Sequence, residues 1–240
     1  MSNKIAKLKY AREVNCYHRA VAEESVADRH SEVLRRMEQV EPPLGWANAV
    51  VPPAPEFGKE IYAGYGVKYQ DKRIKCNGGY AYRDAEYLSV DQSAHDDHLF
   101  FRFDIRDPEI DYGFILHVNA PQIIEAFGAY RADVGFFFYG VLYEERKKET
   151  PQSLRGNPAS NFDGRNSILT LEAACFWDAE LCRRALGYGR DEVIRRLDGK
   201  VPRVEPLIDG VYVVFNDDPD LTFEAYCAYN DALKPVLGLA

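Results

Sequence analysis

The chain has 240 residues, of which 46% are hydrophobic, and this is enough for a core that folds without disulfide bonds or a structural metal. Its formal net charge of −8 at pH 7 weighs against direct binding to the phosphate backbone of DNA or RNA. No stretch approaches the roughly 20 consecutive apolar residues that span a bilayer. We therefore expect neither a nucleic-acid nor a membrane partner.

The N-terminal residues carry charge but no apolar run of signal-sequence length. The five cysteines are odd in number, widely spaced and without a Cys-x-x-Cys pair: Cys16, Cys76, Cys175, Cys182 and Cys227. This spacing predicts neither a disulfide framework nor a thiolate zinc site. A reducing compartment, the cytoplasm, is the predicted location.

In chain order, the first expected element is a strand near Ile5 to Val14. A capped amphipathic helix follows, because Ser25 precedes Asp28 by three residues and apolar residues then recur at helical spacing up to Val40. The double proline Pro42-Pro43 ends this helix, since proline lacks the amide donor that a helix needs. The Pro- and Gly-rich segment that follows is predicted to be a connection packed on the body by its aromatic residues.

The middle of the chain predicts an antiparallel sheet. An alternation typical of a strand with one face in the core sets one series of residues, Leu99, Phe101, Phe103 and Ile105, against another, Phe100, Arg102, Asp104 and Arg106. The expected elements of the middle segment are strands at Tyr80–Tyr82, 99–106 and Phe114–Val118, a helix from Pro121 through Tyr130 and a strand from Val134 to Tyr143. A surface loop is expected from Thr150 to Asn166, and a strand from Ile168 to Ala174. The C-terminal part is expected to contain helices at Trp177–Leu186 and Arg190–Leu197, a strand at Gly210–Phe215 and a final helix capped by Asp220 that extends to about Leu233.

Strands without a regular strand-helix-strand rhythm indicate the α+β class. We predict a single α+β domain over residues 1–240, with a mostly antiparallel sheet and helices packed at one face and at the ends. Trp46 and Trp177 flank helices and are assigned to packing.

Negative charge is concentrated in one segment. Between Asp84 and Asp111 nine carboxylates accompany only Arg102 and Arg106, a local net charge of −7. Such a segment either keeps the protein soluble or steers a positively charged partner. The carboxylates Asp217 and Asp218 near the end of the chain form either an ordinary turn or a second negative contact point.

Possible catalytic and metal-binding clusters are weak. The sequence His95-Asp96-Asp97-His98 contains metal-ligating residue types, but in a strand its side chains alternate between two faces and do not converge. Cys16 and His18 lack a third group that would orient a thiolate-imidazole pair, and we interpret Cys16 as a packing residue. We expect no catalytic residues, no cofactor and no metal.

Three short motifs carry a family resemblance: Glu24 to Trp46 (ESVADRHSEVLRRMEQVEPPLGW), Phe176 to Leu186 (FWDAELCRRAL) and Gly210 to Pro219 (GVYVVFNDDP). Their order resembles immunity protein family 52 of bacterial polymorphic-toxin and type VI secretion systems, over about a third of the chain. The segment from Asp84 to Tyr143 has no counterpart in that pattern. The resemblance implies a non-enzymatic inhibitor of a secreted toxin with a nuclease domain.

The resulting hypothesis is an immunity protein that occludes the active or DNA-binding surface of its cognate toxin. The predicted toxin contacts are the carboxylates Asp96, Asp97, Asp107, Glu109, Asp111, Asp217 and Asp218. Two alternatives stay open: an adaptor that loads an effector without inhibiting it, and a small hydrolase that uses His95 or His98 with a carboxylate. The oligomeric state is left open.

Overall fold

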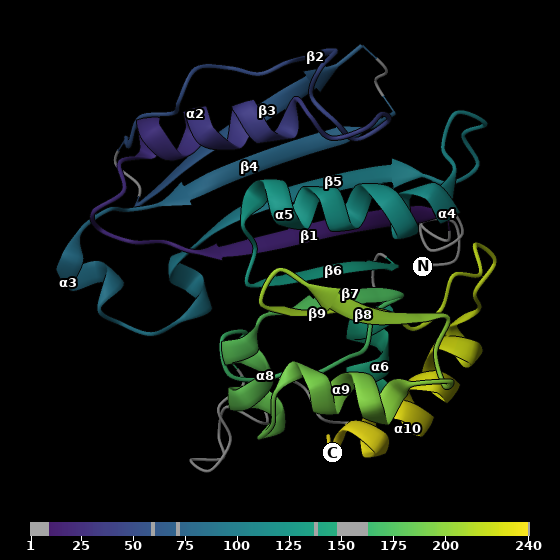
Figure 1. The fold of residues 1–240 in the computed structure, drawn as a ribbon. Helices are drawn as coiled ribbons and strands as arrows, with labels where there is room; N and C mark the ends of the chain where they lie inside the picture. The colour runs from purple at the N-terminus through teal and green to yellow at the C-terminus, as the bar shows by residue number, and fades with distance from the viewer. Residues whose placement is uncertain (1–9, 59–60, 71–72, 137–138, 148–162, 240) are drawn as a thin grey trace.

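The computed structural model describes residues 10–58, 61–70, 73–136, 139–147 and 163–239. Its strands form one antiparallel sheet in the spatial order β2-β3-β4-β5-β1-β6-β7-β9-β8 (Figure 1). The strands are β1 (Ala11–Arg19), β2 (Ala49–Val50), β3 (Tyr62–Tyr69), β4 (Lys75–Ala81), β5 (Asp96–Asp104), β6 (Arg131–Phe136), β7 (Ala174–Trp177), β8 (Arg203–Leu207) and β9 (Gly210–Val214).

The helices fall between and after these strands. They are α2 (Val26–Met37), α3 (Ala85–Leu88), the 3-10 turn η1 (Ser93–His95), α4 (Tyr112–Phe114), the π-helical turn η2 (Ile115–Asn119), α5 (Ala120–Phe127), α6 (Tyr139–Lys147), α8 (Ala179–Leu186), α9 (Arg190–Leu197) and α10 (Phe223–Leu237). The predicted α+β class with an antiparallel sheet is confirmed. Among the described residues, no helix combines the length and apolar character needed to cross a membrane.

Strand β1 lies in the middle of the sheet and pairs with β5 on one side and β6 on the other. Because side chains alternate along a strand, Val14 and Cys16 enter one core, while Asn15 and Tyr17 face the opposite side. β5 repeats this alternation, with Leu99 and the alternate apolar residues after it buried as predicted.

Two helical layers cover opposite faces of the sheet. Helices α2 and α5 lie on one face, over the half that contains β3, β4, β5 and β1, and α8, α9 and α10 lie on the other, over the β7-β9-β8 half (Figure 1). β7 shows why both faces are used, since Phe176 enters the first core and Cys175 and Trp177 enter the second. The sequence had predicted helices on one face and at the ends.

The helix that the sequence predicts most sharply is confirmed as α2. The Ser25 side chain caps it by accepting a hydrogen bond from the Asp28 amide at 3.1 Å. After the helix, the Trp46 amide donates to the Met37 carbonyl at 2.9 Å, and the indole is 1% exposed. The assignments of Trp46 and Trp177 to packing are thus confirmed.

Several predicted boundaries are wrong. Residues 114–118 are helical rather than extended, because neighbouring Ile115 and Leu116 are both buried and continue into the apolar face of α5. The strand expected to reach Tyr143 ends at Phe136, and α6 follows from Tyr139. The first strand runs from Ala11 to Arg19, and the earlier part of its predicted range lies outside the described residues, as does most of the loop predicted at 150–166.

The final helix is capped by Thr222, whose hydroxyl accepts from the Ala225 amide at 3.2 Å, and not by Asp220 as predicted. Replacing Thr222 with Ala removes this acceptor, and we expect the free energy of unfolding to fall by about 1 kcal/mol. Asp220→Ala is the matched control and should leave stability nearly unchanged. Urea unfolding followed by circular dichroism measures both, and an equal loss in the two variants would contradict the assignment.

Candidate partner-binding surfaces and pocket

Asp97 is completely buried at the start of β5, where it accepts hydrogen bonds from a ring of donors. Arg83 donates to both carboxylate oxygens, at 2.8 and 2.7 Å, and the Ala81 amide donates at 3.0 Å. Burial alone would raise the pKa of Asp97, but hydrogen bonds from His18 and Arg83 lower it. Asp97 is therefore an ionised structural group.

Asp96 points to the opposite face of β5 and is 3% exposed. Arg165 donates to it at 2.9 and 2.6 Å, and the Tyr130 hydroxyl donates at 2.6 Å. Arg165 also donates to Asp91 at 3.1 Å, so it links the segment that contains Asp91 to the start of β5. Burial raises the pKa of Asp96 despite these donors.

Asp107 is 7% exposed, pairs with Arg73 and accepts from the Glu109 amide at 3.0 Å. The expectation that Asp96, Asp97 and Asp107 present free negative charge to a partner is therefore corrected. These three carboxylates sit in the interior because guanidinium partners from distant segments compensate their charge there.

The other four predicted contacts lie exposed on one edge of the molecule, which we call the acidic edge: Glu109, Asp111, Asp217 and Asp218. The two pairs are about 100 positions apart in the sequence, yet Arg12 joins them by donating to the Pro219 carbonyl at 2.7 Å while it lies 5.4 Å from the Tyr112 ring. His117 Nε2 lies 3.6 Å from an Asp217 oxygen. Figure 1 places α4 and the segment between β9 and α10 on the same side.

The two histidines of the predicted metal-like cluster have separate neighbours. His95 stacks on Tyr87 with ring centroids 3.9 Å apart, whereas His98 stacks on Tyr62 at 4.9 Å. Burial lowers the pKa of His98. As the alternation of the strand predicts, the imidazoles and carboxylates of this cluster do not converge.

A different trio does converge. His18 Nδ1, Glu24 and Asp97 place ligand-type atoms within 4.8 Å of one another. However, Arg29 Nε lies 3.9 Å from the Glu24 carboxylate and 3.7 Å from Asp97, and Arg83 also pairs with Asp97. Since guanidinium groups already supply the positive charge that an ion would bring, we interpret the trio as part of an ion-pair network. Burial lowers the pKa of His18, which favours the neutral imidazole.

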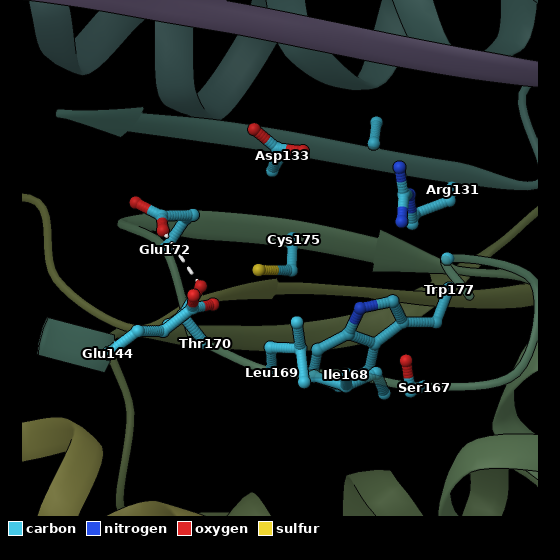
Figure 2. Close-up of a pocket in the computed structure, with 12 residues that line it drawn as sticks. Arg131, Asp133, Glu144, Ser167, Ile168, Leu169, Thr170, Glu172, Cys175 and Trp177 are labelled. Carbon is cyan, nitrogen blue, oxygen red and sulfur yellow. Dashed lines mark hydrogen bonds between the residues drawn. The ribbon is translucent and has the colours of Figure 1, made fainter. Parts of the chain in front are cut away.

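A pocket of about 230 Å³ opens beside β6 and β7, on the sheet face that carries α6. Its polar lining includes Arg131, Asp133, Glu144 and Glu172, and the Cys175 side chain also lines it (Figure 2). Neither His95 nor His98 lines it. None of these pocket residues was predicted from the sequence, although carboxylates within apolar segments, such as Asp133 and Glu172, are a signal that could have indicated them.

Glu172 is a strongly perturbed carboxyl group of the pocket. One of its oxygens accepts from Tyr226 at 2.8 Å and Thr170 at 3.1 Å, while Oε2 is buried and has no hydrogen-bond partner among the described residues. Burial, reinforced by the negative charge of Asp133, raises the pKa of Glu172 to about 8. Burial also raises the pKa of the Cys175 thiol well above its usual value. The pocket therefore holds a carboxylic acid that keeps its proton at neutral pH, beside an unreactive thiol.

Comparisons with known proteins give one informative result. No family model matches the chain, and no curated protein matches its sequence. Among solved structures, the Pseudomonas aeruginosa T6SS protein PA0821 is similar with a TM-score of 0.54, over 95% of this chain and 73% of that chain. The sequences are 12% identical over this match, so the likeness shows a shared fold.

Removing Asp97 tests its structural role. Asp97→Ala leaves Arg83 and Arg29 as buried charges without their main partner, and we expect a loss of about 3–5 kcal/mol in the free energy of unfolding at pH 7. Because the folded-state pKa of Asp97 is lowered, this contribution is fully present above the unfolded-state pKa of about 4 and is lost as the pH falls through the lower folded-state pKa. Urea unfolding at pH 7 and pH 3 measures the difference. Glu109→Ala, at an exposed position, should change stability by less than about 0.5 kcal/mol.

The raised pKa of Glu172 predicts that its contribution to stability has the opposite pH dependence. Between about pH 4.5 and pH 8 the folded protein holds a proton on Glu172 that the unfolded chain has released, so stability falls as the pH rises. Glu172→Gln removes this group, and its melting temperature relative to the unmodified protein should increase from pH 5 to pH 8. Glu125→Gln, on the exposed side of α5, is the control. A difference that does not change with pH would contradict the raised pKa.

Proposed function

We propose that this protein is an immunity protein that binds and neutralises a cognate secreted toxin of a type VI secretion system. Three findings support the proposal: the fold shared with a T6SS protein over 95% of the chain, the three motifs that resemble immunity protein family 52, and the acidic edge. The producer's cytoplasm is the proposed location.

The acidic edge indicates which kind of toxin surface is bound. A nuclease has a basic face for the DNA backbone, and the four exposed carboxylates can pair with that face by charge complementarity. The structure gathers them from two distant parts of the chain around the buried Arg12. Such long-range attraction speeds encounter, while short-range packing keeps the complex together.

The proposed mechanism is occlusion. Phosphate-binding side chains of the toxin would pair with protein carboxylates in place of DNA, so substrate would be excluded from the same face. No chemistry on the toxin is required, and inhibition would last as long as the complex. An adaptor that loads the toxin without inhibiting it would use the same surface but would leave the toxin active.

Coexpression with a candidate toxin from the neighbouring open reading frame tests the proposal in a bacterial host. The protein should restore growth to toxin-producing cells. A variant carrying Glu109→Lys, Asp111→Asn, Asp217→Lys and Asp218→Asn should lose protection, and its association with purified toxin should slow by about 10-fold or more at low salt. The asparagines retain the side-chain oxygens that Phe114 and Asp220 amides use.

The matched control carries Glu38→Lys, Asp191→Lys, Glu125→Gln and Asp198→Asn, which changes the net charge equally at exposed positions on other surfaces. It should protect cells as well as the unmodified protein. Equal losses in both variants would show that only total charge matters, and binding without restored growth would favour the adaptor.

A further inference from the structure

Helix α3 lies beyond the end of β4 (Figure 1), and a series of neighbouring aromatic rings surrounds it. Phe57 contacts Tyr82 with ring centroids 5.3 Å apart, Tyr82 contacts Tyr87 at 6.2 Å, and Tyr87 stacks on His95 at 3.9 Å. Two exposed aliphatic residues are linked to these rings, Ile61 through the backbone of Tyr82 and Val90 through its carbonyl contact with the His95 ring. We call these six residues the aromatic patch: Phe57, Ile61, Tyr82, Tyr87, Val90 and His95.

Three of the six side chains are exposed, while Phe57, Tyr87 and His95 are half-buried. The exposed fractions are 57% for Ile61, 43% for Tyr82 and 44% for Val90. Its backbone links are the Tyr82 amide donating to the Ile61 carbonyl at 3.1 Å and a His95 ring contact to the Val90 carbonyl at 3.2 Å. Tyr82, Ile61 and Val90 thus expose apolar surface beside half-buried rings, as is typical of a contact surface for another macromolecule.

Buried charges fix the patch from behind. Arg83 follows Tyr82 directly and donates to both oxygens of Asp97, while the Asp84 side chain caps α3 by accepting from the Tyr87 amide at 2.9 Å. At the other end, Asp91 and Asp96 share Arg165. The rings are therefore held in place before any partner arrives, which reduces the entropy lost on binding.

The rim of the patch is acidic. Glu56, Asp84 and Glu86 are exposed beside the rings, and within the described part of the chain none of these three side chains forms an ion pair. The neighbouring cation, Arg83, is committed to Asp97. Aromatic faces flanked by carboxylates suit arginine, because its planar guanidinium stacks on a ring while it pairs with a carboxylate.

We propose that the aromatic patch docks an arginine-bearing basic face of a partner protein. This inference rests on the proposed function, in which the partner is the toxin, and it assigns the short-range contacts to a surface separate from the acidic edge. Lysine would fit less well, since its compact ammonium is strongly hydrated and stacks poorly on a ring.

Octa-arginine and octa-lysine peptides are the probes, and their binding to the full chain is measured by fluorescence anisotropy at physiological salt. We expect octa-arginine to bind more tightly than octa-lysine. Tyr82→Ala combined with Tyr87→Ala should weaken octa-arginine binding about tenfold, because two ring contacts are lost. Tyr82→Phe keeps the ring and should stay within about twofold of the unmodified protein.

Two controls keep the result interpretable. Val141→Ala with Ile208→Ala removes exposed apolar side chains elsewhere and should leave peptide binding unchanged. Tyr82→Ala alone, at a half-exposed position, replaces the double variant if circular dichroism shows that the latter is unfolded. Equal binding of the two peptides, or undiminished binding to the Tyr82 and Tyr87 variants, would overturn the proposal.

The proposed function is judged separately, from growth protection by the unmodified protein. If the protein does not protect cells but still binds the peptide through its rings, the immunity function is rejected and the role of the aromatic patch stands. If the protein protects cells fully but its peptide binding does not depend on Tyr82 and Tyr87, the immunity function stands and the role of the aromatic patch is rejected.

Discussion

The buried ion pairs at the start of β5 are the constraint on which the rest of this structure depends. Asp96 and Asp97 leave opposite faces of one strand and bind Arg165 and Arg83, which belong to segments far apart in the sequence. A buried carboxylate is stable only with such partners, so each pair fixes where its arginine-bearing segment must lie. The loop between β4 and β5 is consequently held at both ends.

This constraint links the core to the surface. The same arginines that neutralise the buried carboxylates position α3 and the rings around it. Asp96 and Asp97, which were predicted to contact the partner directly, therefore act from the interior by fixing the position of surface residues. On the opposite side, Arg12 joins the two halves of the acidic edge in a comparable way. The aromatic patch and the acidic edge are thus both held in fixed positions, which suits a protein whose function is to bind a partner.

In the pocket beside β6 and β7, negative charge is neutralised in a different way. Asp133 and Glu172 lie close to one another without a guanidinium between them, and Glu172 responds by keeping its proton. Charge neutralisation by a proton rather than by an arginine makes this region sensitive to pH. It adds a titrating site to a fold in which Asp96, Asp97 and Asp107 are each paired with an arginine.

The sequence by itself determined the elements whose signals are local: the Ser25 cap and apolar face of α2, the alternation along β5, the helices α8 and α9, and the α+β class. Cap hydrogen bonds and side-chain periodicity act within a few residues, so they can be read from the chain. Only the tertiary structure decided that Asp96, Asp97 and Asp107 are buried while Glu109, Asp111, Asp217 and Asp218 share an exposed edge. A carboxylate has the same local sequence signal in water and in the core, because its fate depends on whether folding brings an arginine to it from a distant segment.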